Sequence, residues 1–319
     1  MSTLSTVSRK NAPDAIALIV AFIVIAIWAE TLVSSKILLE EGLQPADILF
    51  YRFILAYAAI WIISPKRIWA YNIKDELKML FLGLSGGSMY FLAENTALEF
   101  STASNVAILV SCTPLITACL SVFIFKDEKM NRQQVYGSIT AFAGIILIIL
   151  NGQLLMHFNP KGDILALTAS LLWAFYTLVI KGMSGRYDAV FMTRKVFFYG
   201  ILTIIPYFFI ARPLTTDMAV LSKPAVWENL VYLGLIAAMG CFMAWNWCIS
   251  RLGTIRTTNI MYSQPFFAMV IAHIVLGDNI SIMAIAGTVI LISGMFMMNY
   301  KKKGKKHKSI NPVMADEKD

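Results

Sequence analysis

The sequence has few charged residues, few histidines and none of the common catalytic motifs. Only 14% of the 319 residues are charged, against about 25% in soluble domains. The three histidines form no H-E-x-x-H pattern, and G-x-S-x-G is also missing, so nothing indicates a zinc protease or a serine hydrolase. The phosphate-binding pattern G-x-x-x-x-G-K-[ST] is absent too, which argues against direct use of ATP. We therefore predict no enzyme and no catalytic residue.

Cysteine is also scarce, and its positions exclude a disulfide framework. The four cysteines form no C-x-x-C pair and all lie in apolar segments; they are Cys112, Cys119, Cys241 and Cys248. A buried free cysteine most often serves as a small apolar packing residue. We predict no disulfide, no metal site and no cofactor.

What the chain does contain is a series of long apolar segments, which make 58% of its residues hydrophobic. A helix needs about 20 apolar residues to cross roughly 30 Å of hydrocarbon. The sequence therefore predicts an all-α integral membrane protein with ten transmembrane helices. We place them at 15–37, 45–63, 77–98, 103–125, 133–151, 162–182, 190–210, 229–250, 256–276 and 281–300. Nine spans are the main alternative.

The distribution of Lys and Arg predicts the orientation of these spans. With the N-terminus in the cytoplasm, the inner segments hold Arg9, Lys10 and the tail lysines between Lys301 and Lys308. The outer segments hold only Lys36, Lys161, Arg212 and Lys223. This asymmetry follows the positive-inside rule and predicts a cytoplasmic (inner) membrane protein with both termini cytoplasmic. The basic tail, residues 301–319, is expected to meet anionic lipid rather than nucleic acid.

The two halves of the chain repeat each other at an offset of 145–151 residues. The segment IWAETLVSSK aligns with LWAFYTLVIK, so that Trp28 matches Trp173, and Asn95 and Pro114 later match Asn246 and Pro265. Each copy, 15–151 and 162–300, contains five predicted spans. Because five is odd, the second copy enters the membrane in the opposite orientation, which predicts two inverted five-helix repeats suited to alternating access.

These segments resemble the EamA domain of the drug/metabolite transporter superfamily. The resemblance rests on the tandem five-helix repeat, the Trp near the end of its first helix, the junction ALEFSTASNVAILVSCTPL and the following DE…G…AGIILI. It implies a ten-helix bundle around a central cavity. It also implies transport of small organic solutes, often export of amino acids or related metabolites. The second copy departs from the pattern, since GDN with Asn279 stands where the first copy has DE.

Three ionisable residues are predicted at one depth in the outer half of the bundle. Glu30 and Arg52 each lie seven positions inside the outer ends of their helices, and Glu94 lies about five inside. A charge at membrane depth is costly unless it is paired, hydrated or neutralised. Three interpretations stay open: a structural ion pair with Arg52 between two carboxylates, snorkelling to the interface, and a site for solute or protons.

Polar and aromatic residues at related positions of the two repeats add further candidates. Aromatic rings near the cavity suit a flat or cationic solute, and a mid-helix proline frees a carbonyl that a ligand can use. Helix packing and interface anchoring are the alternatives, and we interpret Arg194 and Lys195 as topology anchors. The full set of candidates for substrate binding or coupling is Glu30, Arg52, Glu94, Trp28, Trp173, Tyr176, Asn95, Asn246, Asn259, Tyr262 and Gln264.

The sequence therefore predicts a secondary transporter that exports amino acids or related solutes by alternating access. Its predicted partners are a small-molecule substrate and the lipid bilayer. Proton coupling and the choice between monomer and homodimer stay open. A passive channel and a non-transporting membrane scaffold are the alternatives, with an intramembrane enzyme behind them.

Overall fold

The computed structural model describes residues 5–63, 69–101, 106, 109–124, 132–150, 159–276 and 281–299. Within these residues every regular element is a helix. The first half contains α1 (Ser5–Glu40), α2 (Pro45–Ile63), α3 (Ile73–Gly83), η1 (Leu84–Ser88), α4 (Met89–Phe100), α6 (Thr113–Ile124) and α7 (Arg132–Leu150). The second half contains α8 (Pro160–Met183), α9 (Ala189–Ile210), α10 (Met218–Leu221), α11 (Pro224–Val231), η2 (Tyr232–Gly240), α12 (Cys241–Leu252), α13 (Thr254–Thr258), η3 (Asn259–Ser263), α14 (Gln264–Leu276) and α15 (Ile282–Asn299).

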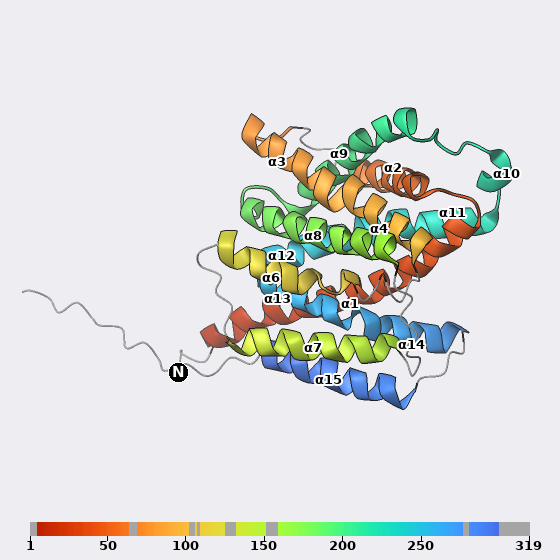
Figure 1. Cartoon of the computed structure of the whole chain (residues 1–319). Helices are drawn as coiled ribbons and strands as arrows, with labels where there is room; N and C mark the ends of the chain where they lie inside the picture. The colour runs from red at the N-terminus through yellow and green to blue at the C-terminus, as the bar shows by residue number, and fades with distance from the viewer. Residues whose placement is uncertain are drawn as a thin grey trace, which may run out of the picture.

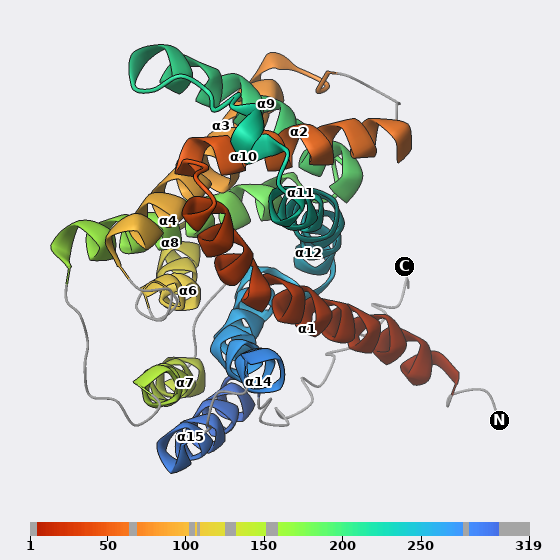
Figure 2. The same cartoon turned by 90° about the vertical axis from the view of Figure 1, so that its right-hand side faces the viewer.

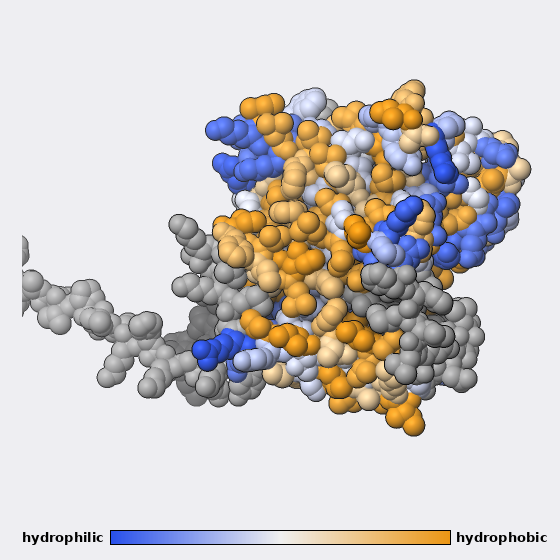
Figure 3. Space-filling model, viewed as in Figure 1, coloured by the Kyte–Doolittle hydropathy of each residue, from blue (hydrophilic) through white to orange (hydrophobic). Residues whose placement is uncertain are grey.

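Several of these helices have the length and composition of membrane spans. Among the described residues, five continuous helices are long and apolar enough to cross a bilayer: Ala15–Glu40, Pro45–Ile63, Pro160–Met183, Ala189–Ile210 and Pro224–Leu252. The helices lie roughly alongside one another (Figure 1). Hydrophobic residues cover much of the visible face between their ends, where hydrophilic residues gather (Figure 3). These features are those of an integral membrane protein.

The helices follow the predicted spans within a few residues, except that α1 begins earlier. The predicted span 77–98 is formed by α3, η1 and α4, and the span 229–250 by α11, η2 and α12. Both η1 and η2 are π-helical, and they occupy similar positions in the two halves. The span 103–125 is described only in part, whereas Asn279 and the tail 301–319 lie outside the described residues.

Local sequence signals set the helix ends. Asn159 caps α8 by accepting from the Lys161 amide, and Pro160 takes the first helical position, where its missing N–H costs nothing. Asp188 caps α9 by accepting from the Phe191 amide at 2.8 Å. Gly253 separates α12 from α13 with a φ of 82°, a left-handed conformation that favours glycine.

The helices α7 and α15 pack closely and antiparallel at one side of the bundle (Figure 2). A Cβ on Gly144 would lie 2.6 Å from the carbonyl oxygen of Gly287, and one on Gly137 would lie 2.7 Å from that of Gly294. The reverse contacts are almost the same, at 2.7 Å and 2.6 Å. Glycine at these positions therefore lets the two backbones approach, as small residues do in membrane helix pairs.

The main hydrophobic core joins α1, α2, α4, α8, α9, η2 and α12, so both halves of the chain contribute to it. It is rich in aromatic rings from both halves, including Trp28, Phe53, Trp173, Phe197 and Phe242. This core surrounds a small cavity near the centre of the molecule.

Candidate functional site

The central cavity is lined by residues from α1, α2, α4, α8, α12, η3 and α14. The lining side chains are Trp28, Thr31, Arg52, Tyr90, Phe91, Glu94, Trp173, Phe242, Met261 and Gln264. Its free volume is about 30 Å³, whereas pockets that hold drug-sized ligands measure roughly 300–1,000 Å³. The cavity is therefore too small for an amino acid, and it must widen to hold one.

Arg52 is the cation of this cavity. Its side chain is only 2% exposed, and its guanidinium carbon lies 4.2 Å from the centre of the Phe91 ring. No carboxylate oxygen of a described residue lies within 4.0 Å of its guanidinium nitrogens. Among the described residues, the Nε of Arg52 has no hydrogen-bond partner. A ring face thus supports the charge, and at least one N–H stays available for an acceptor.

Glu94 is the anion of the same cavity and comes from α4. Its carboxylate is 8% exposed and accepts a hydrogen bond of 2.6 Å from the Tyr90 hydroxyl, one helical turn earlier. Arg52 and Glu94 interact electrostatically across the cavity without forming a direct ion pair. A direct ion pair between Arg52 and a carboxylate was one of three open interpretations, and none forms among the described residues.

Aromatic rings from both halves form the cavity wall. Trp28 and Trp173, which occupy equivalent positions in the repeat, meet edge to face with their ring centres 5.3 Å apart. The Trp28 indole donates to the carbonyl of Ala237 in η2 at 2.9 Å. The Trp173 indole nitrogen is buried and has no partner among the described residues. It is a second donor that a solute can use.

Gln264 is a polar cavity-lining residue from the second half of the chain. It begins α14 directly after the 3₁₀ segment η3. Its amide donates to the Trp28 carbonyl at 3.4 Å. Pro265 follows in the first turn of α14, where the missing N–H is tolerated. The change from 3₁₀ geometry in η3 to α geometry in α14 comes directly before this proline.

Glu30 lies outside the cavity lining. Both oxygens of its carboxylate accept from the Ser34 hydroxyl, at 2.7 Å and 2.9 Å, one turn later in α1. It also interacts with the side chain of Tyr232 in η2, whose hydroxyl donates to the Ile27 carbonyl. The carboxylate is therefore held at the junction of α1 and η2, and it forms no ion pair with Arg52.

The remaining predicted residues hold helices together around the site. Tyr176 donates to the Asn246 side chain at 2.7 Å, and Asn246 donates to Thr193 at 2.9 Å, so this chain joins α8, α12 and α9. Asn95 donates weakly to the Pro45 carbonyl at 3.4 Å. Asn259 and Tyr262 are buried in η3, and Tyr262 packs against α7 and α15. None of these five residues lines the cavity.

Sequence reasoning missed five residues that line the cavity: Thr31, Tyr90, Phe91, Phe242 and Met261. Tyr90 could have been found, because it stands four positions before Glu94 and residues at that spacing share a helix face. Phe242 carries no such signal, since an apolar ring in an apolar helix looks the same whether it faces lipid or a cavity.

At one end of the bundle, the start of α2 is tied to the segment before α10. Asp47 accepts from the Thr215 hydroxyl at 2.6 Å and from the Thr215 amide at 3.2 Å. The Tyr51 hydroxyl donates to the Thr215 carbonyl at 2.5 Å. An ion pair of 2.8 Å joins Lys223 to Glu41 nearby. We call these contacts the Asp47 network, and they join the first half of the chain to the second.

At the other end, the start of α3 is tied to α9 and the turn before it. Asp75 accepts from Arg186 at 3.1 Å and from the Tyr187 hydroxyl at 3.0 Å. Glu76 accepts from Lys195 and from the Tyr199 hydroxyl. We call these contacts the Asp75–Glu76 network. It also joins the two halves of the chain.

Arg194 and Lys195, which we interpreted as topology anchors, are both buried, with 3% of each residue exposed. Lys195 pairs with Glu76 and lies 4.7 Å from the Trp69 ring centre. The Arg194 guanidinium carbon lies 4.9 Å from the Trp61 ring centre. Acidic and aromatic partners from α3 and the α2 region let the two cations be buried.

The Asp75–Glu76 network also changes the acidity of its carboxyls. Burial by itself raises the pKa of Asp75, but the Tyr187 hydroxyl and the Arg186 guanidinium together hold this pKa below its usual range. Burial likewise raises the pKa of Glu76, and Lys195 and Tyr199 more than offset that effect. Both carboxylates are therefore kept charged at neutral pH.

Comparisons with known proteins point to transport. A profile of the EamA-like transporter family matches residues 15–150 and 160–300. An uncharacterized transporter of Archaeoglobus fulgidus is 27% identical over 86% of this chain and 94% of its own length. A probable terminal-alkyne amino-acid exporter of Streptantibioticus cattleyicolor is 23% identical over 89% of this chain and 94% of its own. A probable amino-acid metabolite efflux pump of Salmonella typhimurium is 24% identical over 87% of this chain and 92% of its own length.

A solved crystal structure has a similar fold. It superposes with a TM-score of 0.69 and covers 89% of this chain and 96% of its own. The two sequences are 15% identical, so this likeness concerns the fold alone.

Proposed function

Because the chain belongs to the EamA-like transporter family, we propose that it is a secondary transporter that exports amino acids or related metabolites by alternating access. The observation that carries the proposal is that Arg52 and Glu94 line one cavity and do not form a direct ion pair. A zwitterionic amino acid can place its carboxylate at Arg52 and its ammonium group at Glu94. The aromatic wall of Trp28, Trp173 and Phe242 then suits a side chain that is apolar or flat.

The proposed architecture is a pair of inverted five-helix repeats, 15–151 and 162–300, with the tail 301–319 in the cytoplasm. The antiparallel contact of α7 with α15 supports it. Gly137 meets Gly294 and Gly144 meets Gly287, so each helix gives the same pair of positions to the contact. Such reciprocal contacts are those of two related units about a twofold axis.

Alternating access requires that each end of the cavity open in turn. The Asp47 network and the Asp75–Glu76 network close opposite ends, because α2 crosses the bundle between them. Both networks join the first half of the chain to the second, so a rocking motion of the halves must break one while keeping the other. A free volume of about 30 Å³ is too small for an amino acid, so the cavity must also widen when one end opens.

Glu94 is our candidate for proton coupling, since it is the one ionisable acid among the cavity-lining residues. A carboxylate that meets the solute's ammonium group can exchange a proton when the solute leaves. Glu30, held by Ser34 outside the lining, is expected to affect transport less.

Counterflow in proteoliposomes tests both the transport of amino acids and the coupling of transport to protons through Glu94. Purified protein is reconstituted with an unlabelled amino-acid mixture inside, and uptake of each labelled amino acid is followed at several pH values. Glu94→Gln removes a charge-assisted hydrogen bond worth about 1.5–3 kcal/mol, so we expect counterflow to fall about tenfold or more. The remaining flux should lose its pH dependence.

Glu99→Gln is the matched control, because Glu99 lies on the same helix but is exposed, and it should behave as the wild type does. Equal flux and equal pH profiles for both variants would reduce Glu94 to a structural role. Flux that never saturates, with no counterflow, would favour a passive channel instead.

We further propose that the protein lies in the cytoplasmic (inner) membrane with both termini in the cytoplasm. The excess of Lys and Arg in the predicted inner segments supports this orientation. Protease protection of tags placed at either end, in intact cells and in inverted vesicles, tests it. Termini found on opposite faces would contradict the inverted repeat.

A further inference from the structure

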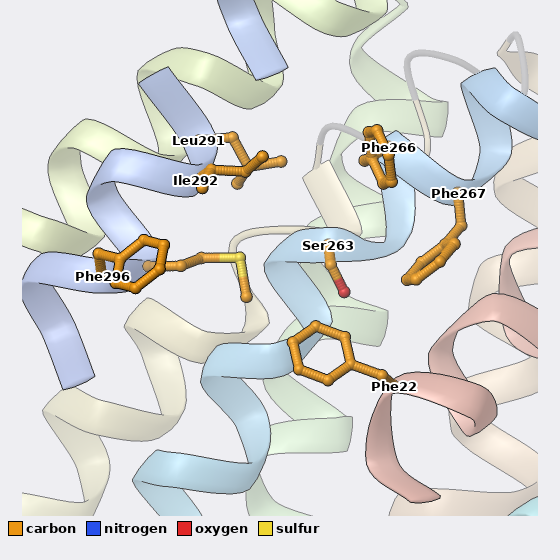
Figure 4. Close-up of a pocket in the computed structure, with 8 residues that line it drawn as sticks. Phe22, Ser263, Phe266, Phe267, Leu291, Ile292 and Phe296 are labelled. Carbon is orange, nitrogen blue, oxygen red and sulfur yellow. The ribbon is translucent and has the colours of Figure 1, made fainter. Parts of the chain in front are cut away.

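A second hollow lies between α1, η3, α14 and α15, apart from the central cavity. Its volume is about 330 Å³, and its lining is almost entirely apolar. The lining residues are Phe22, Ser263, Phe266, Phe267, Leu291, Ile292, Met295 and Phe296. Figure 4 shows Phe22 on one side and Ile292 and Phe296 on the other, with Ser263 between them. We call this hollow the lateral groove.

Among the described residues that line it, the lateral groove offers a solute no free polar group. Their one hydroxyl belongs to Ser263, and it already donates to the Ile260 carbonyl at 2.7 Å. A hydrogen-bonding metabolite would therefore lose its bonds to water without replacement, which disfavours its binding. The occupant must be a hydrocarbon.

The groove opens on the surface that faces the membrane interior. Phe22, Ile292 and Phe296 are exposed by 37%, 45% and 75%. The neighbouring residues Ile19 and Val289 are also exposed, so the rim is apolar as well. In an integral membrane protein, the molecules that reach such a rim are the lipids around it.

We propose that the lateral groove binds an acyl chain of a membrane phospholipid. A volume of 330 Å³ is at the lower end of ordinary ligand pockets, and a flexible chain can fit it by lying along α15. The lipid tails of the bilayer are as apolar as the groove, so shape and dispersion contacts, rather than transfer out of water, hold the chain there.

The position of the groove links this lipid to the central cavity. Ser263 lines the groove, whereas its neighbours Met261 and Gln264 line the cavity. The short 3₁₀ segment η3 is therefore the wall between the two. An acyl chain in the groove packs against the outer side of this wall.

Native mass spectrometry of the detergent-purified protein tests the proposal. Ile292→Trp places a larger ring in the groove, and Ile285→Trp is the matched control because Ile285 is 55% exposed on the same helix but outside the groove. We expect the wild type and Ile285→Trp to retain a phospholipid that Ile292→Trp loses at least threefold. Equal retention by all three proteins would overturn the proposal.

Photolabelling of the unmodified protein keeps the test independent of any folding defect. The probe is a phosphatidylcholine with a diazirine near the end of one acyl chain, reconstituted with the protein in vesicles. We expect labelling at Phe22, Ile292 and Phe296 at least threefold above that at Leu202, an exposed residue of α9. Equal labelling at all four positions would mean ordinary bilayer contact and would overturn the site. A wild-type protein that is dimeric and an Ile292→Trp variant that is monomeric would also overturn the proposal, because a second copy of the chain, rather than a lipid, would then fill the groove.

Discussion

At the scale of single residues, the charges of the cavity are supported by rings and hydroxyls. Phe91 lies against the Arg52 guanidinium, and the Tyr90 hydroxyl donates to Glu94. These neighbours lower the cost of a charge away from water without cancelling it, as a direct ion pair would. The charges thus remain available to a solute of opposite charge.

The two equivalent tryptophans give a matched stability test. Trp28→Phe removes the hydrogen bond to the Ala237 carbonyl, whereas Trp173→Phe removes an indole N–H that has no partner among the described residues. A lost hydrogen bond costs about 1 kcal/mol. We expect Trp28→Phe to lower the free energy of unfolding by about that much more than Trp173→Phe does. Denaturant titration in micelles measures the difference, and an equal loss for both variants would refute the assignment.

At this scale the sequence predicted the residues that break the apolar pattern, and it could not predict their partners. Arg52 and Glu94 stand out because charges are rare at membrane depth. Glu30 stands out for the same reason, yet its carboxylate accepts a hydrogen bond from Ser34 and does not line the cavity. The direction in which a side chain points depends on helix rotation, which a uniformly apolar helix does not encode.

At the scale of helices, close approach depends on particular glycines. A Cβ on Gly86 in η1 would lie 2.1 Å from the ring of Tyr176, whereas one on Gly240 in η2 would meet only the Leu235 carbonyl at 3.5 Å. The contact of Gly86 with Tyr176 shows that the small residues of the segment GLSGGSMY pack against α8. Hydropathy could not predict the π-helical turns, because it depends on side-chain type and carries no information on the backbone hydrogen-bond pattern.

These two glycines predict opposite outcomes for the same substitution. Gly86→Ala must displace the Tyr176 ring, and overpacking of this kind costs about 1–3 kcal/mol. Gly240→Ala has room and should leave stability unchanged or slightly raised. Thermal unfolding of the two variants in the same detergent measures both effects. Comparable melting temperatures would contradict the packing of η1 against α8.

The Asp75–Glu76 network predicts a dependence of stability on pH. The pKa of Asp75 is lower in the folded protein than in the unfolded chain, so its contribution is complete above the unfolded pKa and is lost as pH falls through the folded one. We expect the wild type to lose thermal stability below about pH 4, and Asp75→Asn to lose less over the same range. Glu99→Gln, an exposed control, should follow the wild type. A pH profile unchanged by Asp75→Asn would contradict the network.

At the scale of the whole molecule, the two halves meet in the core, at both ends and along α7 and α15. The internal repeat predicted that the halves are related, because matching residues recur in order. It could not predict which helices touch: Gly137 meets Gly294, and Gly144 meets Gly287. The contacts at the two ends could not be predicted either, since Thr215 has no distinctive sequence signal and the charge of Lys195 does not reveal its partner Glu76.

The central claim is that the cavity between the halves opens to each side of the membrane in turn. Its most direct test replaces the four native cysteines by alanine and introduces Thr31→Cys in the cavity lining, with Ala166→Cys as a buried control outside it. A membrane-impermeant thiol reagent is then applied to right-side-out and to inverted vesicles. We predict that Cys at position 31 reacts from both sides, more slowly with solute present, and that the control does not react. Reaction from one side only would contradict alternating access.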